Sequence, residues 1–258
     1  MLELLGGSLG AVLLMGLAAL VIGVSKTALG GLAVVAVAIF ATILPAKEST
    51  AAILTLLIVG DLVAVWHYRH DADWSLIRRL LPAVLPGLVL GSVFVRFVSD
   101  GVLRRSIGAV LLVLLLLQLL VKWRDDVSSP SAGDATGSRA HEHRAVAWTA
   151  GTAAGFVTMT ANAAGAVMTL YLSASGIDKR RFIGTNAWFF LIVNLVKVPF
   201  SVGLGLMHWT DIGRAGLLAP LILLGGVLGY AAVRRISQHR FDIAVLLASV
   251  IAASALLL

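Results

Sequence analysis

The sequence predicts an all-α polytopic membrane protein of about eight to ten transmembrane or re-entrant helices, arranged as two inverted pseudo-repeats. The first observation is composition: of 258 residues, 59% are hydrophobic and 13% are charged. Soluble domains contain about 45–50% apolar and about 25% charged residues. This apolar excess must face lipid, which excludes a soluble enzyme. The chain also has no cysteine, which excludes disulfide frameworks, zinc–cysteine sites and thiol catalysis.

The second observation is a series of ten apolar segments, each bounded by charged or turn-forming residues. In the first half the segments are Leu5–Val24, Ala28–Leu44, Thr50–Trp66, Leu76–Val98 and Leu103–Val121. In the second half they are Ala145–Ala161, Ala163–Ile177, Phe182–Leu206, Ile212–Val233 and Ile243–Leu258. The stretch 122–144 is hydrophilic and has the composition of a mobile linker. We therefore expect a first repeat over 1–121, a linker over 122–144 and a second repeat over 145–258.

Each apolar segment ends at a charged or turn-forming stretch of the sequence. In the first half the segments stop at Ser25-Lys26-Thr27, Pro45-Ala46-Lys47, the polar stretch 67–73, Ser99-Asp100 and Lys122. In the second half they stop at Asn162, the charged stretch 178–181, the stretch 208–211 and Arg234-Arg235. Helices end at such charged, glycine- or proline-containing stretches because these residues favour turns or water over lipid.

The third observation is an ordered similarity between the two halves. The matched positions are Gly30-Gly31 with Ala164-Gly165, Asp61 with Asn194, Trp74 with Trp209, Gly87 and Gly91 with Gly225 and Gly229, and Arg96 with Arg234. Their common order predicts an internal duplication, which is frequent among membrane transporters.

Basic residues indicate the orientation of the repeats. If every segment crosses, an odd number per half inverts the second repeat, and one side receives nearly three times as many Lys and Arg residues as the other. A parallel arrangement with merged first segments gives almost no bias. The positive-inside rule then favours the inverted arrangement, with the linker in the cytoplasm and both termini outside. The net charge of +7 follows from these basic loops. We expect no nucleic-acid partner, because no basic run is interleaved with aromatic residues.

Polar residues interrupt the apolar pattern early in each half, over 23–31 and 158–165. Broken helices present free N–H groups and a positive dipole end to an anion. Both stretches are therefore predicted to form a substrate site. The alternative is two plain extramembrane turns whose glycines permit close helix packing.

Two charged residues fall well inside other segments, Asp61 and Lys197. A charge at the bilayer centre costs at least about 2.5–3.5 kcal/mol, so it usually faces a partner, water or substrate. We expect Lys26 and Lys197 to offset the charge of an anion, with Asp61 as a proton carrier or as their salt-bridge partner. Asn194 shares a helix face with Lys197, and Asn186 is expected to line the same path at another depth. Alternatively, Asp61 snorkels to the interface and Lys197 stretches along its helix.

Other chemistries lack support. His141-Glu142-His143 lies in the linker with the wrong spacing for a helical zinc motif, so no metal and no cofactor are expected. No phosphate-binding loop or nucleophile elbow occurs. An intramembrane enzyme would need a paired nucleophile and base at membrane depth, and none is evident, so we expect no enzyme.

The glycine-containing elements Ala28–Leu32 and Asn162–Ala166 resemble those of the sulfite exporter TauE/SafE family, as does the duplicated plan. The turn Pro45-Ala46-Lys47 leading into 49–52, with its counterpart 177–186, extends the resemblance over nearly the whole chain outside the linker. The chain departs from the family in having fewer consecutive glycines. The resemblance implies a secondary carrier, an exporter of sulfite, thiosulfate, sulfoacetate or other organosulfonates, in a bacterial inner membrane. By resemblance, its site residues are Ser25, Lys26, Thr27, Gly30, Gly31, Thr160, Asn162 and Gly165.

The sequence thus predicts a transporter of a small sulfur-containing anion in the lipid bilayer. Transport of another small solute, such as a metal ion, would predict several intramembrane carboxylates, and only Asp61 is available. A non-transporting membrane scaffold would not need polar breaks in both halves. Glycine pairs at four-residue spacing allow helix association either within one chain or in a homo-oligomer.

Overall fold

The computed structural model describes residues 7–28, 32–127, 139–174 and 177–233. Over these ranges the chain forms nine α-helices and no strand, which confirms the predicted all-α class. The helices are α1 (Leu9–Thr27), α2 (Ala33–Ile43), α3 (Ala46–Tyr68), α4 (Trp74–Phe97), α5 (Asp100–Val127), α6 (Arg139–Ala161), α7 (Gly165–Ala174), α8 (Lys179–Gly203) and α9 (Trp209–Val233). The tenth predicted segment, Ile243–Leu258, lies outside the described residues.

Five of the described helices, α1, α3, α4, α8 and α9, are long and apolar enough to cross a membrane, as expected for a polytopic membrane protein. The helices α2 and α7 differ, with 11 and 10 residues. At 1.5 Å per residue each is only about 15–16 Å long, about half of a hydrocarbon core of roughly 30 Å. Each is therefore too short to cross by itself, which favours the re-entrant alternative for the second and seventh segments.

Helix ends differ from the predicted segments where polar residues continue a helix. The helix α1 includes Ser25, Lys26 and Thr27, so the first break begins at Ala28. The Thr27 hydroxyl donates to the carbonyl of Gly23 in the preceding turn, and a polar side chain satisfied in this way does not interrupt a helix. Likewise α5 extends to Val127 and α6 begins at Arg139, so helix ends reach into the stretch 122–144.

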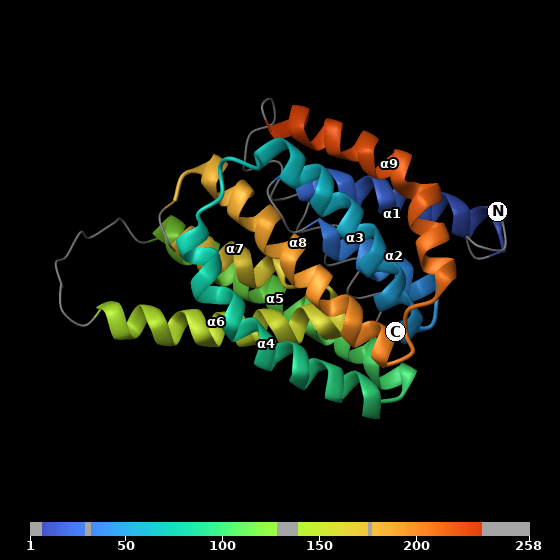
Figure 1. Cartoon of the computed structure of the whole chain (residues 1–258), viewed down its shortest axis with the longest axis horizontal. Helices are drawn as coiled ribbons and strands as arrows, with labels where there is room; N and C mark the ends of the chain where they lie inside the picture. Colours follow the sequence, from blue (N-terminus) through green and yellow to red (C-terminus); the bar gives the residue numbers. More distant parts are fainter. Residues whose placement is uncertain (1–6, 29–31, 128–138, 175–176, 234–258) are drawn as a thin grey trace.

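Two long helix pairs frame the molecule: α1 lies along α9, and α4 lies along α6, with α3 and α8 between them (Figure 1). Glycines set the close approach in both pairs. A Cβ at Gly87 would collide with the carbonyl of Thr152 on α6, and one at Gly225 would collide with the carbonyl of Leu20 on α1. The glycine pairs of α4 and α9 therefore serve crossings within one chain, and they carry no argument for a homo-oligomer.

The partners in these pairs come from opposite halves of the chain. The sequence similarity matches α1 with α6 and α4 with α9. When each helix is replaced by its match, the pair α1–α9 becomes the pair α6–α4, and both pairs are packed together in the structure. A two-fold relation between the halves would require this. The inverted orientation of the repeats stays a prediction.

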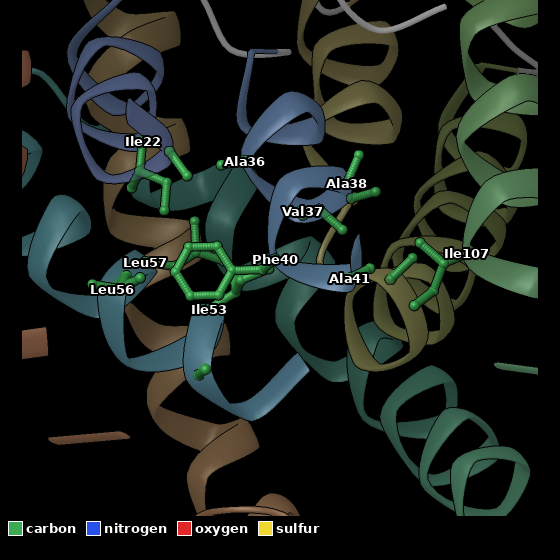
Figure 2. Packing of buried hydrophobic residues seen from close by; sticks show 14 of the residues in the cluster. Ile22, Ala36, Val37, Ala38, Phe40, Ala41, Ile53, Leu56, Leu57 and Ile107 are labelled. Atoms are coloured by element: carbon green, nitrogen blue, oxygen red, sulfur yellow. The ribbon is translucent and has the colours of Figure 1, made fainter. Parts of the chain in front are cut away.

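Buried apolar side chains fix the position of both short helices. Phe40, Val37 and Ala41 of α2 pack among Ile53 and Leu57 of α3, together with side chains of α1 and α5 (Figure 2). A second cluster holds α7 through Met168 and Leu172, which are buried with residues of α4, α6 and α8. Because these side chains anchor the two short helices, the start of each is held at a defined place in the interior.

Candidate functional site

A cavity lies where the two breaks approach each other. Its void is about 400 Å³ including its opening. The lining residues are Ser25 and Lys26 of α1, Ala33 of α2, Leu57 of α3, Thr158 of α6, Asn162 after α6, Gly165 of α7, and Asn186, Phe190 and Asn194 of α8. Ala33 and Gly165 are the first residues of the two short helices. Both half-helix N-termini therefore contribute to one cavity, with the positive ends of their dipoles.

The first break is shaped by Ser25. Its hydroxyl oxygen accepts a hydrogen bond from the Ala33 N–H at 3.0 Å, which ties the end of α1 to the start of α2. The residue before α2, Leu32, provides no side-chain cap. The end of α1 and the start of α2 are thus joined beside the cavity by one side chain.

A buried ion pair forms one wall of the cavity. Lys26 Nζ lies 2.6 Å from Asp61 Oδ1, and the side chain of Asp61 is completely buried. Asn194 Nδ2 donates to Asp61 Oδ2 at 2.6 Å. Lys26 Nζ also lies 4.6 Å from the centre of the Phe190 ring, which favours a cation over its face. Asp61 is therefore a salt-bridge partner of Lys26, and the snorkelling alternative is excluded because the carboxylate reaches no solvent.

The second lysine, Lys197, contacts two residues that line the cavity, Thr158 and Asn162. Lys197 is 1% exposed, and its ammonium donates to the Thr158 carbonyl at 2.7 Å, to the Thr158 hydroxyl at 3.2 Å and to Asn162 Oδ1. All three N–H groups are thus engaged, at the carboxyl end of α6 where a cation also compensates the helix dipole. Lys197 therefore does not stretch along α8, as the alternative interpretation expected.

Asn162 determines where α6 ends. Its φ is 51°, a left-handed conformation that asparagine tolerates better than most residues and that terminates helices. Its side-chain amide donates to the Thr50 carbonyl of α3 at 3.0 Å while its Oδ1 accepts from Lys197. One asparagine thus connects α3, α6 and α8 at the second break.

The charges around the cavity do not cancel. Asp61 pairs with Lys26, whereas Lys197 has neutral acceptors and, within the described ranges, no carboxylate within 4 Å. When Lys197 is protonated, one positive charge therefore remains beside the two helix N-termini. No group of three or more metal-ligating side chains occurs in the part of the chain that the structure describes. This arrangement can attract and hold an anion.

The structure brings many of the predicted site residues together. Ser25, Lys26, Asn162, Gly165, Asn186 and Asn194 line the cavity, and Asp61 and Lys197 stand directly behind it.

Two predicted site residues have other contacts. The Thr27 hydroxyl donates to the carbonyls of Gly23 and Gly226, and the Thr160 hydroxyl donates to the carbonyl of Phe156. Both hydroxyls stabilise helices and helix crossings rather than line the cavity. Gly30 and Gly31, and the side chains of His141, Glu142 and His143, lie outside the described residues.

Three lining residues lie outside the predicted site: Ala33, Leu57 and Phe190, whereas Thr158 belongs to the predicted break 158–165. Leu57 and Phe190 are separated by the same interval as Asp61 and Asn194, 133 residues. The predicted repeat therefore contained a signal for them, because each stands four residues, about one helical turn, before a polar residue of the matched pair. Apolar side chains give no chemical signal of their own in so apolar a sequence.

Comparison with known proteins gives one match. The family described as Sulfite exporter TauE/SafE matches residues 15–257, which include both breaks and every residue that lines the cavity. No curated protein and no solved structure matches the chain.

Proposed function

Since the chain belongs to the sulfite exporter TauE/SafE family, whose members are membrane transporters of sulfur-containing anions, we propose that it is a secondary transporter that exports sulfite or a small organosulfonate by alternating access. The observation that carries this proposal is the unbalanced positive charge of Lys197 behind a cavity that both half-helix N-termini line. An anion in the cavity compensates that charge, and the positive dipole ends of the two short helices orient its oxygens.

Ion pairs at the two ends of α3 support alternating access. At its start, Glu48 pairs with Arg214 of α9 at 3.0 Å. Just beyond its end, Asp71 pairs with Arg180 of α8 at 3.4 Å. The proposal is that these contacts close opposite ends of the path in turn, since each joins elements from different halves of the chain.

Asp61 is the proposed site of proton coupling. Its carboxylate contacts Lys26 and Asn194, and Lys197 is the other charged group that faces it from a neighbouring helix. Protonation of Asp61 would release Lys26 toward the cavity and add one positive charge to it. Acidification would then increase anion binding, and Asp61→Asn would remove this dependence on pH.

The transport proposal is tested by counterflow in proteoliposomes that contain purified protein. Labelled sulfite and labelled sulfoacetate are supplied outside, with the same unlabelled anion inside. Wild type is expected to accumulate at least one label, whereas Lys197→Met should lower the initial rate at least about tenfold, because the charge of the site is lost. Lys47→Met, in the first turn of α3 and away from the cavity, is the matched control and should retain the wild-type rate.

The outcome also separates the alternatives. If wild type exchanges neither anion at any pH, the assignment to sulfur-containing anions is lost, and another solute or a scaffold role takes its place. A metal ion is disfavoured because Asp61, which lies behind the cavity, already pairs with Lys26. We further propose a bacterial inner membrane as the location, with 122–144 at the cytoplasmic face, from the distribution of basic residues.

A further inference from the structure

Asp61 determines which way the amide of Asn194 faces. A carboxylate paired with a lysine is charged and can only accept hydrogen bonds. The group of Asn194 that lies 2.6 Å from Asp61 Oδ2 must therefore be the NH₂ group. The carbonyl oxygen Oδ1 of Asn194 is consequently the part of this side chain left for other partners.

That carbonyl oxygen has no hydrogen-bond partner in the part of the chain that the structure describes. Asn194 is 1% exposed and lines the cavity, and its Oδ1 is buried without a donor within reach among the described residues. Asn186, two turns earlier on α8, also lines the cavity, and its buried Oδ1 has no hydrogen-bond partner within the described ranges. A buried acceptor left unpaired costs about 1–3 kcal/mol, so natural proteins rarely keep one without a use.

The two amide oxygens can only accept hydrogen bonds, and a fully deprotonated anion also offers only acceptors. The two therefore cannot pair. Sulfite and sulfoacetate as dianions would satisfy the lysine charge and the helix N-termini but not Asn194 or Asn186. An anion that carries an O–H or N–H group would satisfy both sets of groups. The cavity also has one positive charge in excess, that of Lys197, when Lys26 and Asp61 are both charged.

We propose that the cavity selects a singly charged sulfur oxyanion that carries its own hydrogen-bond donor, such as hydrogensulfite or a hydroxyalkanesulfonate, over a dianion or a donor-free sulfonate. Asn194 accepts the hydrogen bond, with Asn186 as a second acceptor, and Asp61 is a positioning residue that holds Asn194 in the accepting orientation. This inference rests on the proposed transport of sulfur-containing anions and specifies which of their protonation states and substituents the site recognises.

The test compares two ligands of equal charge and nearly equal shape. In 2-hydroxyethanesulfonate a hydroxyl stands where propane-1-sulfonate has a methyl group. Their dissociation constants are measured by calorimetry on the purified full-length protein at one pH, with sulfoacetate as the dianion and sulfite as the reference. Wild type is expected to bind the hydroxyl compound about tenfold tighter than the methyl compound, and sulfoacetate is expected to bind more weakly than either.

Substitutions test which residues cause the preference for the hydroxyl compound over the methyl compound. In Asn194→Leu the ratio of the two dissociation constants should fall toward one, and Asn186→Leu should lower it by a smaller factor. In Asp61→Asn the side chain at position 61 can donate as well as accept hydrogen bonds. The amide of Asn194 is then free to turn, and the ratio of the two dissociation constants should also fall. Thr55→Val removes another buried hydroxyl of α3, one that donates to the backbone carbonyls of Ala52 and Asp211 and does not line the cavity, and it should leave the ratio unchanged. A ratio measured within one variant does not depend on how much of the sample is folded.

The results distinguish this inference from the function on which it rests. If wild type binds sulfite and both sulfonates but with a ratio near one, sulfur-anion transport stands and the donor requirement is wrong. A ratio that persists in both asparagine variants would equally overturn it. If wild type binds none of the four ligands, the proposed function fails, and this inference fails with it.

Discussion

Asn194 of α8 and Asp61 of α3 meet in a hydrogen bond of 2.6 Å, and they occupy matching positions in the two halves of the chain. A strictly symmetric pair would place two carboxylates or two amides against each other. Two carboxylates would repel, and two amides would leave Lys26 without its counter-charge. A donor at one position and an acceptor at the other make this contact between the two halves a stable one.

The Lys26–Asp61 pair predicts a non-additive effect on stability. Asp61→Leu leaves the Lys26 ammonium buried without its partner and should destabilise the protein by roughly 3–5 kcal/mol. Adding Lys26→Met should recover most of that loss, because an apolar pair replaces the ion pair. Denaturant unfolding in detergent measures both variants. Asp71→Asn, which affects an ion pair whose Arg180 side chain is 75% exposed, is the control and should cost less than about 1 kcal/mol. Equal losses for Asp61→Leu and Asp71→Asn would contradict this account.

The crossing of α1 and α9 predicts opposite results for two glycines of one helix. Gly225→Ala places a Cβ against the carbonyl of Leu20, whereas Gly216→Ala places one in open space. The first change should lower stability by about 1–3 kcal/mol because the helices must separate. The second should be neutral or stabilising by up to about 1 kcal/mol, since alanine favours helix. Thermal unfolding of the purified variants measures both changes in stability. A Gly225→Ala protein as stable as Gly216→Ala would refute the close crossing.

Two substitutions of Asn162 separate its effect on the backbone from its effect on transport. At φ 51°, glycine is unstrained and alanine is strained by about 1 kcal/mol. Asn162→Ala should therefore be about 1 kcal/mol less stable than Asn162→Gly. Both variants remove one of the three acceptors of Lys197, so both should lose sulfite counterflow to a similar extent. If the more stable glycine variant keeps counterflow and the alanine variant loses it, the amide has no role in the site.

Two helix-starting aspartates should differ in importance. Asp211 in the first turn of α9 is fully buried, accepts from the His208 N–H at 2.8 Å and pairs with Arg214 at 2.8 Å. Asp178 caps α8 in an exposed position by accepting from the N–H groups of Arg180 and Arg181. Asp211→Ala should cost roughly 2–4 kcal/mol, whereas Asp178→Ala should cost about 1 kcal/mol. The comparison is made by unfolding both proteins under identical conditions, and the reverse order would contradict the burial of the Asp211 cluster.

Much of the site was predictable because intramembrane polar residues are rare. Lys197, Asp61, Lys26 and the two breaks stand out in an apolar chain, and the structure brings them together around one cavity. What could not be predicted is which partner each one takes. Lys26 is partly buried and Lys197 is fully buried, yet Lys26 pairs with a carboxylate and Lys197 with carbonyl, hydroxyl and amide oxygens.

The sequence by itself determined the membrane class, the helical content and the family, because hydrophobicity over some twenty residues is a local property that needs no knowledge of neighbours. It also marked the breaks, although Thr27 and Thr160 show that a hydroxyl near a break can belong to the helix instead. Only the tertiary structure decided that the starts of α2 and α7 share one cavity, that Asp61 turns the amide of Asn194, and that Phe190 and Leu57 line the walls. The reason is that the direction of each side chain depends on how its helix is rotated and crossed, and glycine contacts such as Gly225 against Leu20 set those crossings between residues some two hundred positions apart.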